Sequence, residues 1–219
     1  AGATMVVGVL GALVERNVLR LMAFLVISAM GYVLMGFAFF TTLGLVGAIF
    51  YILQDVPVKT TLFLIGGLMK RETGTLRLEK MSGLYEYRPL LALAFIVPAF
   101  SLAGFPPFPG FWAKLTLVQA GLEAGQWTLV AVALIVGLLT LLVVAQVWSR
   151  AFWRSSTEQE GFRTPDAFGT RALLQGPVAA LALVLFVVGL YAQPLYVLAQ
   201  RAAVNLADTG PYIQAVLGG

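Results

Sequence analysis

Several runs of about 20 apolar residues, the length that crosses a bilayer, constrain the fold of this chain most strongly, and two such runs contain a lysine. Lys59 lies in YILQDVPVKTTLFLIGG and Lys114 lies in GFPPFPGFWAKLTLVQAG. Hydrophobic residues make up 60% of the 219 residues and charged residues only 11%. This composition predicts an all-α, polytopic membrane helix bundle. A charged side chain at membrane depth is costly, so both lysines are candidates for an ion or proton pathway.

The composition also excludes several kinds of site. The chain contains no cysteine and no histidine, which excludes disulfides, thiolate metal sites and the usual proton carrier at neutral pH. It contains no phosphate-binding glycine loop, no metal-ligand cluster and no nucleophile beside a base. We therefore predict no cofactor, no metal and no nucleic-acid partner, and we assign the net charge of +4 to membrane loops. Because the chain starts with Ala1 inside an apolar run, we expect it to be a fragment that lacks an N-terminal portion.

The apolar runs predict the crossings. The expected spans are 3–14, which is short, and 18–39, 43–69, 127–152 and 176–199. Two further pieces, 89–104 and 110–122, are separated by FPPFP. A 16-residue helix rises about 24 Å, which is less than the hydrocarbon core of about 30 Å. The two pieces are therefore each short for a complete crossing.

The distribution of basic residues favours one proline-broken helix over 89–122. With that arrangement, Arg201 lies on one side of the membrane and the other basic loop residues lie on the opposite side, as the positive-inside rule expects: Arg16, Arg20, Lys70, Arg71, Arg77, Lys80, Arg88, Arg150, Arg154, Arg163 and Arg171. The sequence thus predicts about six crossings of the plasma (inner) membrane, with these loops cytoplasmic. Residues 1–200 form the bundle and 201–219 a short extracytoplasmic tail. The alternative is that Pro106, Pro107 and Pro109 form a simple extracellular turn.

Asp55 and Lys59 are four residues apart in one predicted helix, so they share a helix face and can form an ion pair. Pro57 lies between them and lacks an N–H, which should bend or loosen the helix there. Gln54 adds a neighbouring polar side chain. The pair could exchange protons, or it could be an inert ion pair that fixes the register of the helix.

Lys114 has no carboxylate three or four residues away in either direction. Its partner must therefore come from another helix, from backbone groups freed at the proline break, or from water. The alternative is that its ammonium reaches along the helix to the membrane interface. Other polar residues within spans could join a water chain or bond back to their own helix: Ser28, Ser101, Thr140 and Gln146.

Three segments carry a family resemblance: RNVLRLMAFLVISAMGYVLMG, QDVPVKTTLFLIGGLMKRETGT and AFSLAGFPPFPGFWAKLTLV. Together they resemble the proton-pumping antiporter-like family, which includes the large membrane subunits of respiratory complex I and of Mrp-type cation/proton antiporters. The likeness is greatest to the D-type subunits of Mrp complexes, of which this chain resembles the C-terminal portion.

The resemblance implies that Lys114 matches the lysine or glutamate at the end of the family's proton path, in its second broken helix. It implies that Lys59 matches a lysine of several members, and that Asp55 stands in place of a histidine. Arg20 is kept, whereas Ala29 replaces a frequent histidine or glutamine. The histidine-based relay of relatives is therefore absent.

We predict an ion-translocating subunit of a multisubunit monovalent cation/proton antiporter, most simply for Na⁺. Protons would pass through Asp55, Lys59, Lys114 and water, with Gln54, Pro57, Pro106, Pro107 and Arg20 in support. The expected partners are other membrane subunits, the lipid bilayer, H⁺ and the cation. One alternative is a proton-pumping subunit of an NADH:quinone oxidoreductase or a membrane-bound hydrogenase complex, in which case the chain would be the proton-translocating module of an enzyme. The other is a purely structural membrane subunit.

Overall fold

The computed structural model describes residues 1–153 and 168–207, and these consist of helices and their connections without a β-strand. In chain order the elements are α1 (Gly2–Val14), α2 (Val18–Ala38), α3 (Thr42–Thr73), η1 (Leu78–Lys80), α4 (Leu84–Tyr87), α5 (Pro89–Ala103), α6 (Pro109–Glu123), α7 (Trp127–Val147), the π-helical turns η2 (Trp148–Trp153), α8 (Phe168–Leu190) and α9 (Gln193–Ala207). The predicted all-α bundle is confirmed.

Local sequence signals explain where the long helices begin and end. The Asn17 side chain accepts hydrogen bonds from the backbone N–H groups of Leu19 and Arg20 and so caps α2. Thr41 caps α3 in the same way. At its other end α3 stops at Gly74, whose φ of 69° suits a residue without a side chain.

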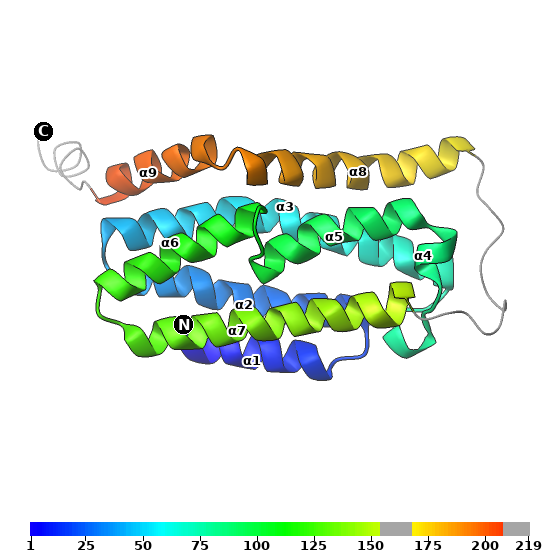
Figure 1. Cartoon of the computed structure of the whole chain (residues 1–219), viewed down its shortest axis with the longest axis horizontal. Helices are drawn as coiled ribbons and strands as arrows, with labels where there is room; N and C mark the ends of the chain where they lie inside the picture. The colour runs from blue at the N-terminus through cyan, green and yellow to red at the C-terminus, as the bar shows by residue number, and fades with distance from the viewer. Residues whose placement is uncertain (154–167, 208–219) are drawn as a thin grey trace, which may run out of the picture.

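The long helices lie side by side along the length of the molecule (Figure 1). The α1–α2 connection, the segment between α3 and α5, and the end of α7 lie toward the right of that view, whereas the α2–α3 and α6–α7 connections lie at the left end. The segments that carry the described basic loop residues therefore lie toward one end of the bundle. Arg154, Arg163 and the tail segment 208–219 lie outside the described residues.

Apolar residues cover the outside of the bundle as well as its interior. In α7, Val136 and Val143 are fully buried, while Leu134 and Leu138 on another face are 58% and 65% exposed. Among the described residues, α2, α3 and the continuous stretch formed by α7 and η2 are each long and apolar enough to cross a membrane. A helix that is apolar all round in a bundle of this kind lies in lipid.

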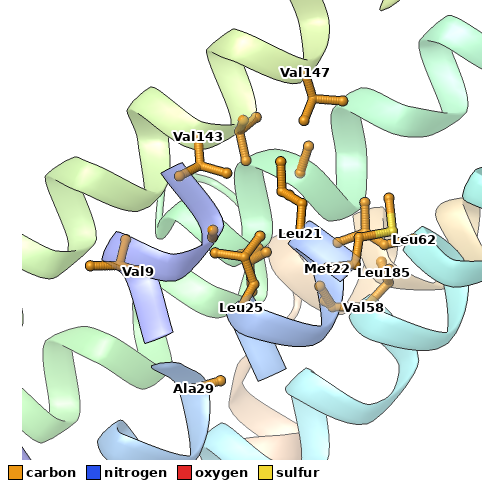
Figure 2. Packing of buried hydrophobic residues seen from close by; sticks show 14 of the residues in the cluster. Val9, Leu21, Met22, Leu25, Ala29, Val58, Leu62, Val143, Val147 and Leu185 are labelled. Atoms are coloured by element: carbon orange, nitrogen blue, oxygen red, sulfur yellow. The ribbon is translucent and has the colours of Figure 1, made fainter. Parts of the chain in front are cut away.

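The interior holds helices together through aliphatic contacts and close backbone approach. Buried side chains from α1, α2, α3, α7 and α8 meet in one cluster (Figure 2). A Cβ added at Gly8 of α1 would lie 2.6 Å from the Cα of Ser28, and one at Gly31 of α2 would lie 2.7 Å from the backbone nitrogen of Met5. Small residues thus bring α1 and α2 into direct backbone contact, as in other membrane helix pairs.

The predicted break between 89–104 and 110–122 is confirmed. α5 ends at Gly104, whose φ is 83° and whose N–H donates to the carbonyls of Phe100 and Ser101. After a short turn, α6 begins with Pro109 at its first position, where the missing N–H costs no helical hydrogen bond. The two pieces follow one another in the same direction, and the break lies midway along the bundle (Figure 1). The prolines therefore do not form a simple turn at one end of the bundle.

The last predicted span, 176–199, differs from the structure. It contains two helices, α8 and α9, bent by 78° at a break over Tyr191 and Ala192. Pro194 explains the break, because in a continuous helix its ring would clash with the carbonyl of Leu190, four residues earlier. α9 also continues to Ala207, so the first residues after Ala199 are helical.

Candidate functional site

Asp55 and Lys59 form the expected ion pair on α3. Lys59 Nζ lies 2.5 Å from Asp55 Oδ2, and the two side chains are 12% and 4% exposed. The other carboxylate oxygen of Asp55 is buried without a hydrogen-bond partner in the described part of the chain. α3 continues through Pro57 to Thr73 without ending.

The ion pair lines a groove of about 590 Å³ between α2 and α3. Val26 and Met30 of α2 form the facing wall, and Thr60 adds a hydroxyl on the α3 side. The Thr60 hydroxyl donates to the carbonyl of Val56. Asp55 and Lys59 are the charged residues of the lining. The rest of the lining on α3, Val56, Phe63 and Leu64, is apolar, so the groove reaches the ion pair across a mostly apolar surface.

Lys114 of α6 reaches the end of the other half-helix. Its Nζ donates to the carbonyl oxygens of Leu102 and Ala103, at 2.9 and 3.1 Å. These carbonyls are free for it because α5 stops at Gly104. A Cβ at Gly104 would lie 2.7 Å from Lys114 Cδ, so only glycine leaves room for the lysine stem. Of the partners that the sequence left open, the freed backbone provides the hydrogen bonds, and the ammonium does not reach toward an end of the bundle.

Asp55 connects the two lysines electrostatically. Its carboxylate interacts with Lys59 and also with Lys114. The carboxylate attracts Lys59 of its own helix most strongly and Lys114 of α6 more weakly. Charges interact strongly in a low-dielectric interior, so a change of charge at one lysine alters the stability of charge at the other.

Ser101 joins α3 to both sides of the break. Its hydroxyl donates to Gln54 Oε1 at 3.3 Å and accepts from the backbone N–H of Gly110 at 3.1 Å. Gly110 packs directly on the Ser101 carbonyl, where a Cβ would overlap it. The residue before Asp55 therefore holds the α5–α6 junction against α3. The sequence indicated Ser101 only as a possible water-chain residue, and this connecting role was missed.

Two tyrosines that were not predicted from the sequence complete the surroundings. The Tyr32 ring lies 4.9 Å from Lys114 Nζ and stacks on Tyr51 at 5.3 Å with an interplanar angle of 7°. Tyr32 Oη donates to the carbonyl of Ala133 on α7 at 2.6 Å. The sequence signal that could have indicated Tyr51 was its position, four residues before Asp55 on the same helix. The hydrogen-bond acceptors of Lys114 are neutral carbonyls, and the Tyr32 ring adds a cation–π contact to its ammonium.

The other predicted supporting residues lie apart from this cluster. Pro106 and Pro107 are exposed in the turn of the break. Arg20 lies in the first turn of α2, at the end of the bundle, where it lines a pocket with Arg16 and Arg77. The structure thus brings together Gln54, Asp55, Lys59 and Lys114, but not Arg20. Among the described residues no group of acidic side chains could hold a metal ion.

Comparisons with known proteins agree with this architecture. Residues 1–140 match the family model described as NADH:quinone oxidoreductase/Mrp antiporter, TM. The chain is 39% identical over 220 residues to the D-type subunit of the Na(+)/H(+) antiporter of Alkalihalophilus pseudofirmus, covering 99% of this chain and 43% of that protein. It is 34% identical over 217 residues to the corresponding protein of Bacillus subtilis, with the same coverage of 99% and 43%.

Solved structures show the same relationship. The structure of the Mrp complex from Dietzia sp. DQ12-45-1b matches with a TM-score of 0.88 and 37% identity, over 99% of this chain and 48% of that one. Respiratory complex I from Thermus thermophilus with bound aureothin matches with a TM-score of 0.71 and 28% identity, over 89% of this chain and 43% of that one. The chain spans less than half the length of these relatives. It belongs to the NADH:quinone oxidoreductase/Mrp antiporter transmembrane family.

Proposed function

We propose that this chain is the ion-translocating C-terminal part of a D-type subunit in a multisubunit Na⁺/H⁺ antiporter. The similarity to the D-type antiporter subunit of Alkalihalophilus pseudofirmus over 99% of the chain supports this assignment. Proton uptake would drive export of Na⁺ or another monovalent cation, and other membrane subunits would continue the polar path beyond this chain. The end of the bundle that carries the arginine-rich connections would face the cytoplasm, with the C-terminal end of α9 outside.

The position of Lys114 is the observation that carries the proposal. Its ammonium sits on the free carbonyls of a helix that is broken midway along the bundle. Helices broken at membrane depth are a recurring feature of ion sites in transporters. Neutral carbonyls stabilise the ammonium without neutralising it, so its charge state depends on the carboxylate of Asp55.

Proton movement then follows from the shared carboxylate. When Asp55 is held by Lys59, its attraction for Lys114 is divided, and Lys114 can release its proton to water at the break. When Lys59 loses its own proton, Asp55 is left to stabilise the charged form of Lys114. Exchange among Asp55, Lys59, Lys114 and ordered water would move protons through the middle of the membrane, while the Ser101 hydrogen bonds keep α3 and the break together.

The test is sodium-dependent proton flux through the complete complex in everted vesicles, read with a pH-sensitive dye. Lys114→Ala should abolish the flux triggered by sodium without loss of assembly. Lys80→Ala is the matched control, because Lys80 is an exposed lysine of η1 at the bundle end. Wild-type flux in an assembled Lys114→Ala complex would show that this lysine is not part of the path.

A second candidate is supported by the match to a chain of respiratory complex I from Thermus thermophilus. In that case the same residues would move protons in a redox-driven complex. The subunits that copurify with the chain distinguish the two: iron–sulfur proteins indicate the redox complex and small membrane subunits indicate the antiporter. A purely structural subunit predicts a different result, in which Lys59→Ala and Lys114→Ala alter assembly but leave the flux per assembled complex unchanged.

A further inference from the structure

A second group of charged side chains lies at the bundle end, in a pocket of about 620 Å³ at the junction of α1, α2 and η1. We call it the arginine pocket, and its charged lining consists of Glu15, Arg16, Arg20, Arg77 and Glu79. Arg20 is the one predicted site residue among them. None of the three residues proposed to carry protons lines this pocket, so it requires its own explanation.

Backbone hydrogen bonds fix the pocket in place. The segment before η1 pairs with the α1–α2 connection through a β-bridge between Asn17 and Arg77. Val18 N–H donates to the carbonyl of Leu76, and Leu78 N–H donates to the carbonyl of Arg16, at 3.0 and 2.9 Å. Arginines that are far apart in the sequence are therefore held at the same pocket before any ligand arrives.

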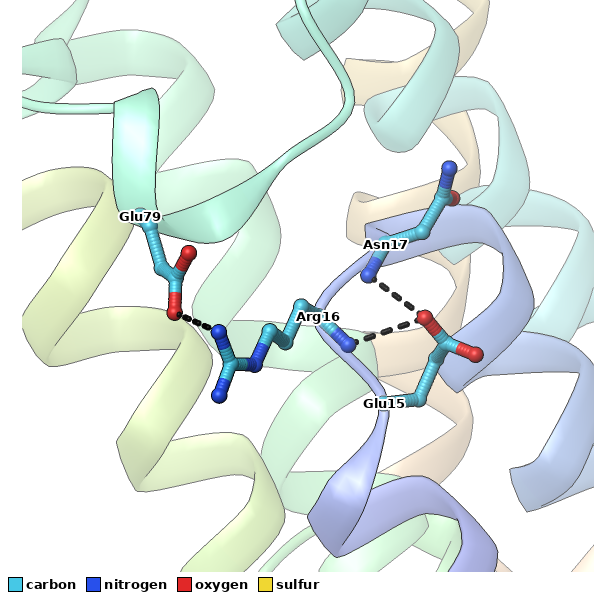
Figure 3. Close-up of polar contacts among 4 residues, drawn as sticks. All are labelled: Glu15, Arg16, Asn17 and Glu79. Carbon is cyan, nitrogen blue, oxygen red and sulfur yellow. Dashed lines mark hydrogen bonds and ion pairs between the residues drawn. The ribbon is translucent and has the colours of Figure 1, made fainter.

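The two glutamates of the pocket are already engaged (Figure 3). Glu15 Oε1 accepts from the backbone N–H groups of Asn17 and Arg16, both at 2.9 Å. The hydrogen bond from Asn17 is the main reason that the pKa of Glu15 lies below its ordinary value, so this carboxylate is charged near neutral pH. Glu79 forms an ion pair with Arg16 at 2.8 Å.

In the part of the chain that the structure describes, neither Arg20 nor Arg77 forms an ion pair at contact distance; the positive charge of Arg20 helps to lower the pKa of Glu15. Both arginines are exposed and both line the pocket. The three arginines of the lining face two glutamates, which leaves one net positive charge. That charge matches a monoanionic phosphodiester, which two guanidinium groups can bind through paired hydrogen bonds.

The apolar part of the lining favours a lipid over a soluble phosphate. Gly11 and Phe24 form the pocket wall on the side of α1 and α2. On α1, Val14, Leu10 and Val7 continue from the pocket along one helix face, at 80%, 48% and 62% exposure. Acyl chains would cover this strip while the headgroup occupies the charged pocket. A soluble phosphate would make no use of this apolar strip.

We propose that the arginine pocket binds the headgroup phosphate of an anionic phospholipid, with Arg20 and Arg77 as the phosphate ligands. Basic pockets between membrane helices at the cytoplasmic face suit such headgroups. The site is independent of the proton path proposed above. A lipid bound here would bridge α1, α2 and η1.

The test is lipid binding to the assembled complex by native mass spectrometry, with phosphatidylglycerol as the probe and phosphatidylcholine, whose zwitterionic headgroup has no net charge, as the comparison. We expect Arg20→Gln and Arg77→Gln each to weaken phosphatidylglycerol binding about fivefold, and the double variant about 25-fold, from about 1 kcal/mol per basic residue near the membrane surface. Lys80→Gln removes the same charge from the same end of the bundle but does not line the pocket, so binding should stay at the wild-type level.

Three results would overturn the proposal. The first is unchanged phosphatidylglycerol binding in the double variant. The second is an equal loss in Lys80→Gln, which would mean that the whole basic surface attracts lipid without a specific site. The third is displacement of the lipid by millimolar inorganic phosphate, which would keep the phosphate chemistry but assign the pocket to a soluble ligand.

Discussion

Replacing Gly104 by alanine should reduce ion transport, because the new methyl group displaces the aliphatic stem of Lys114. Two costs are expected. The φ of 83° is a left-handed conformation that costs an L-residue about 1–2 kcal/mol. In addition, the new Cβ would lie 2.7 Å from Lys114 Cδ. The stem must then move while its ammonium is anchored on two carbonyls, and losing one such charged hydrogen bond costs about 1.5–3 kcal/mol.

Gly74→Ala separates these two costs. Gly74 ends α3 with a φ of 69°, and a Cβ added there would meet no atom within 4 Å. The free energy of unfolding of Gly74→Ala should therefore fall only by the backbone cost of about 1–2 kcal/mol. Gly104→Ala should be destabilised by about 2.5–5 kcal/mol in total, the sum of the backbone and hydrogen-bond costs.

The assay is thermal unfolding of the purified complex combined with sodium-dependent proton flux in vesicles, both normalised to assembled protein. We expect Gly74→Ala to show a small drop in melting temperature and wild-type flux. Gly104→Ala should show the larger drop and greatly reduced flux. Equal melting temperatures and equal flux in the two variants would refute the argument, because they would mean that Lys114 is not held at the end of α5.

Three further predictions concern buried or charged groups. Ser101→Ala removes both hydrogen bonds that tie the break to α3 and should cost about 1–3 kcal/mol in thermal unfolding, whereas Thr116→Val, which loses only a bond within its own helix, should cost less. Asp55→Asn or Lys59→Met alone should reduce stability by about 3–5 kcal/mol, and the double variant should cost less than the sum, as a double-mutant cycle will show. The pKa of Glu15 is lowered from 4.5 mainly by a backbone hydrogen bond, so its stabilisation is present above pH 4.5 and is lost as the pH falls through the lower folded value. Melting curves of wild type and Glu15→Gln should therefore differ at pH 7 and converge below pH 4.5, and a difference that persists in acid would contradict this assignment.

The sequence predicted the helices well where the apolar runs agree with the capping and proline signals at their ends. The span expected at 18–39 became α2 (Val18–Ala38) because Asn17 caps its start, and the break between α5 and α6 followed from FPPFP and the loop charges. The bend between α8 and α9 was missed although Pro194 marks it. The apolar run continues across this proline, and the prediction gave more weight to the apolar run than to the backbone N–H that Pro194 lacks.

The candidate site was predictable in identity but not in partners. Spacing alone pairs Asp55 with Lys59, and the structure confirms the contact. No local pattern says that Lys114 meets the carbonyls of Leu102 and Ala103, because that contact depends on how the chain turns between two half-helices. Arg20 was grouped with the path because of a family resemblance, and only the tertiary fold places it at the bundle end.

The two lysines differ in whether a mutation can change the groups that hold them. Lys59 pairs with a side chain, so exchange of Asp55 and Lys59 is a meaningful variant and a compensating change can arise at either position. Lys114 is held by main-chain oxygens, which remain whatever side chains occupy residues 102 and 103. Suppressors of a Lys114 variant should therefore arise at positions that set the backbone of the turn, such as Gly104, and the reciprocal-charge pattern that marks ion pairs in sequence families should be absent there.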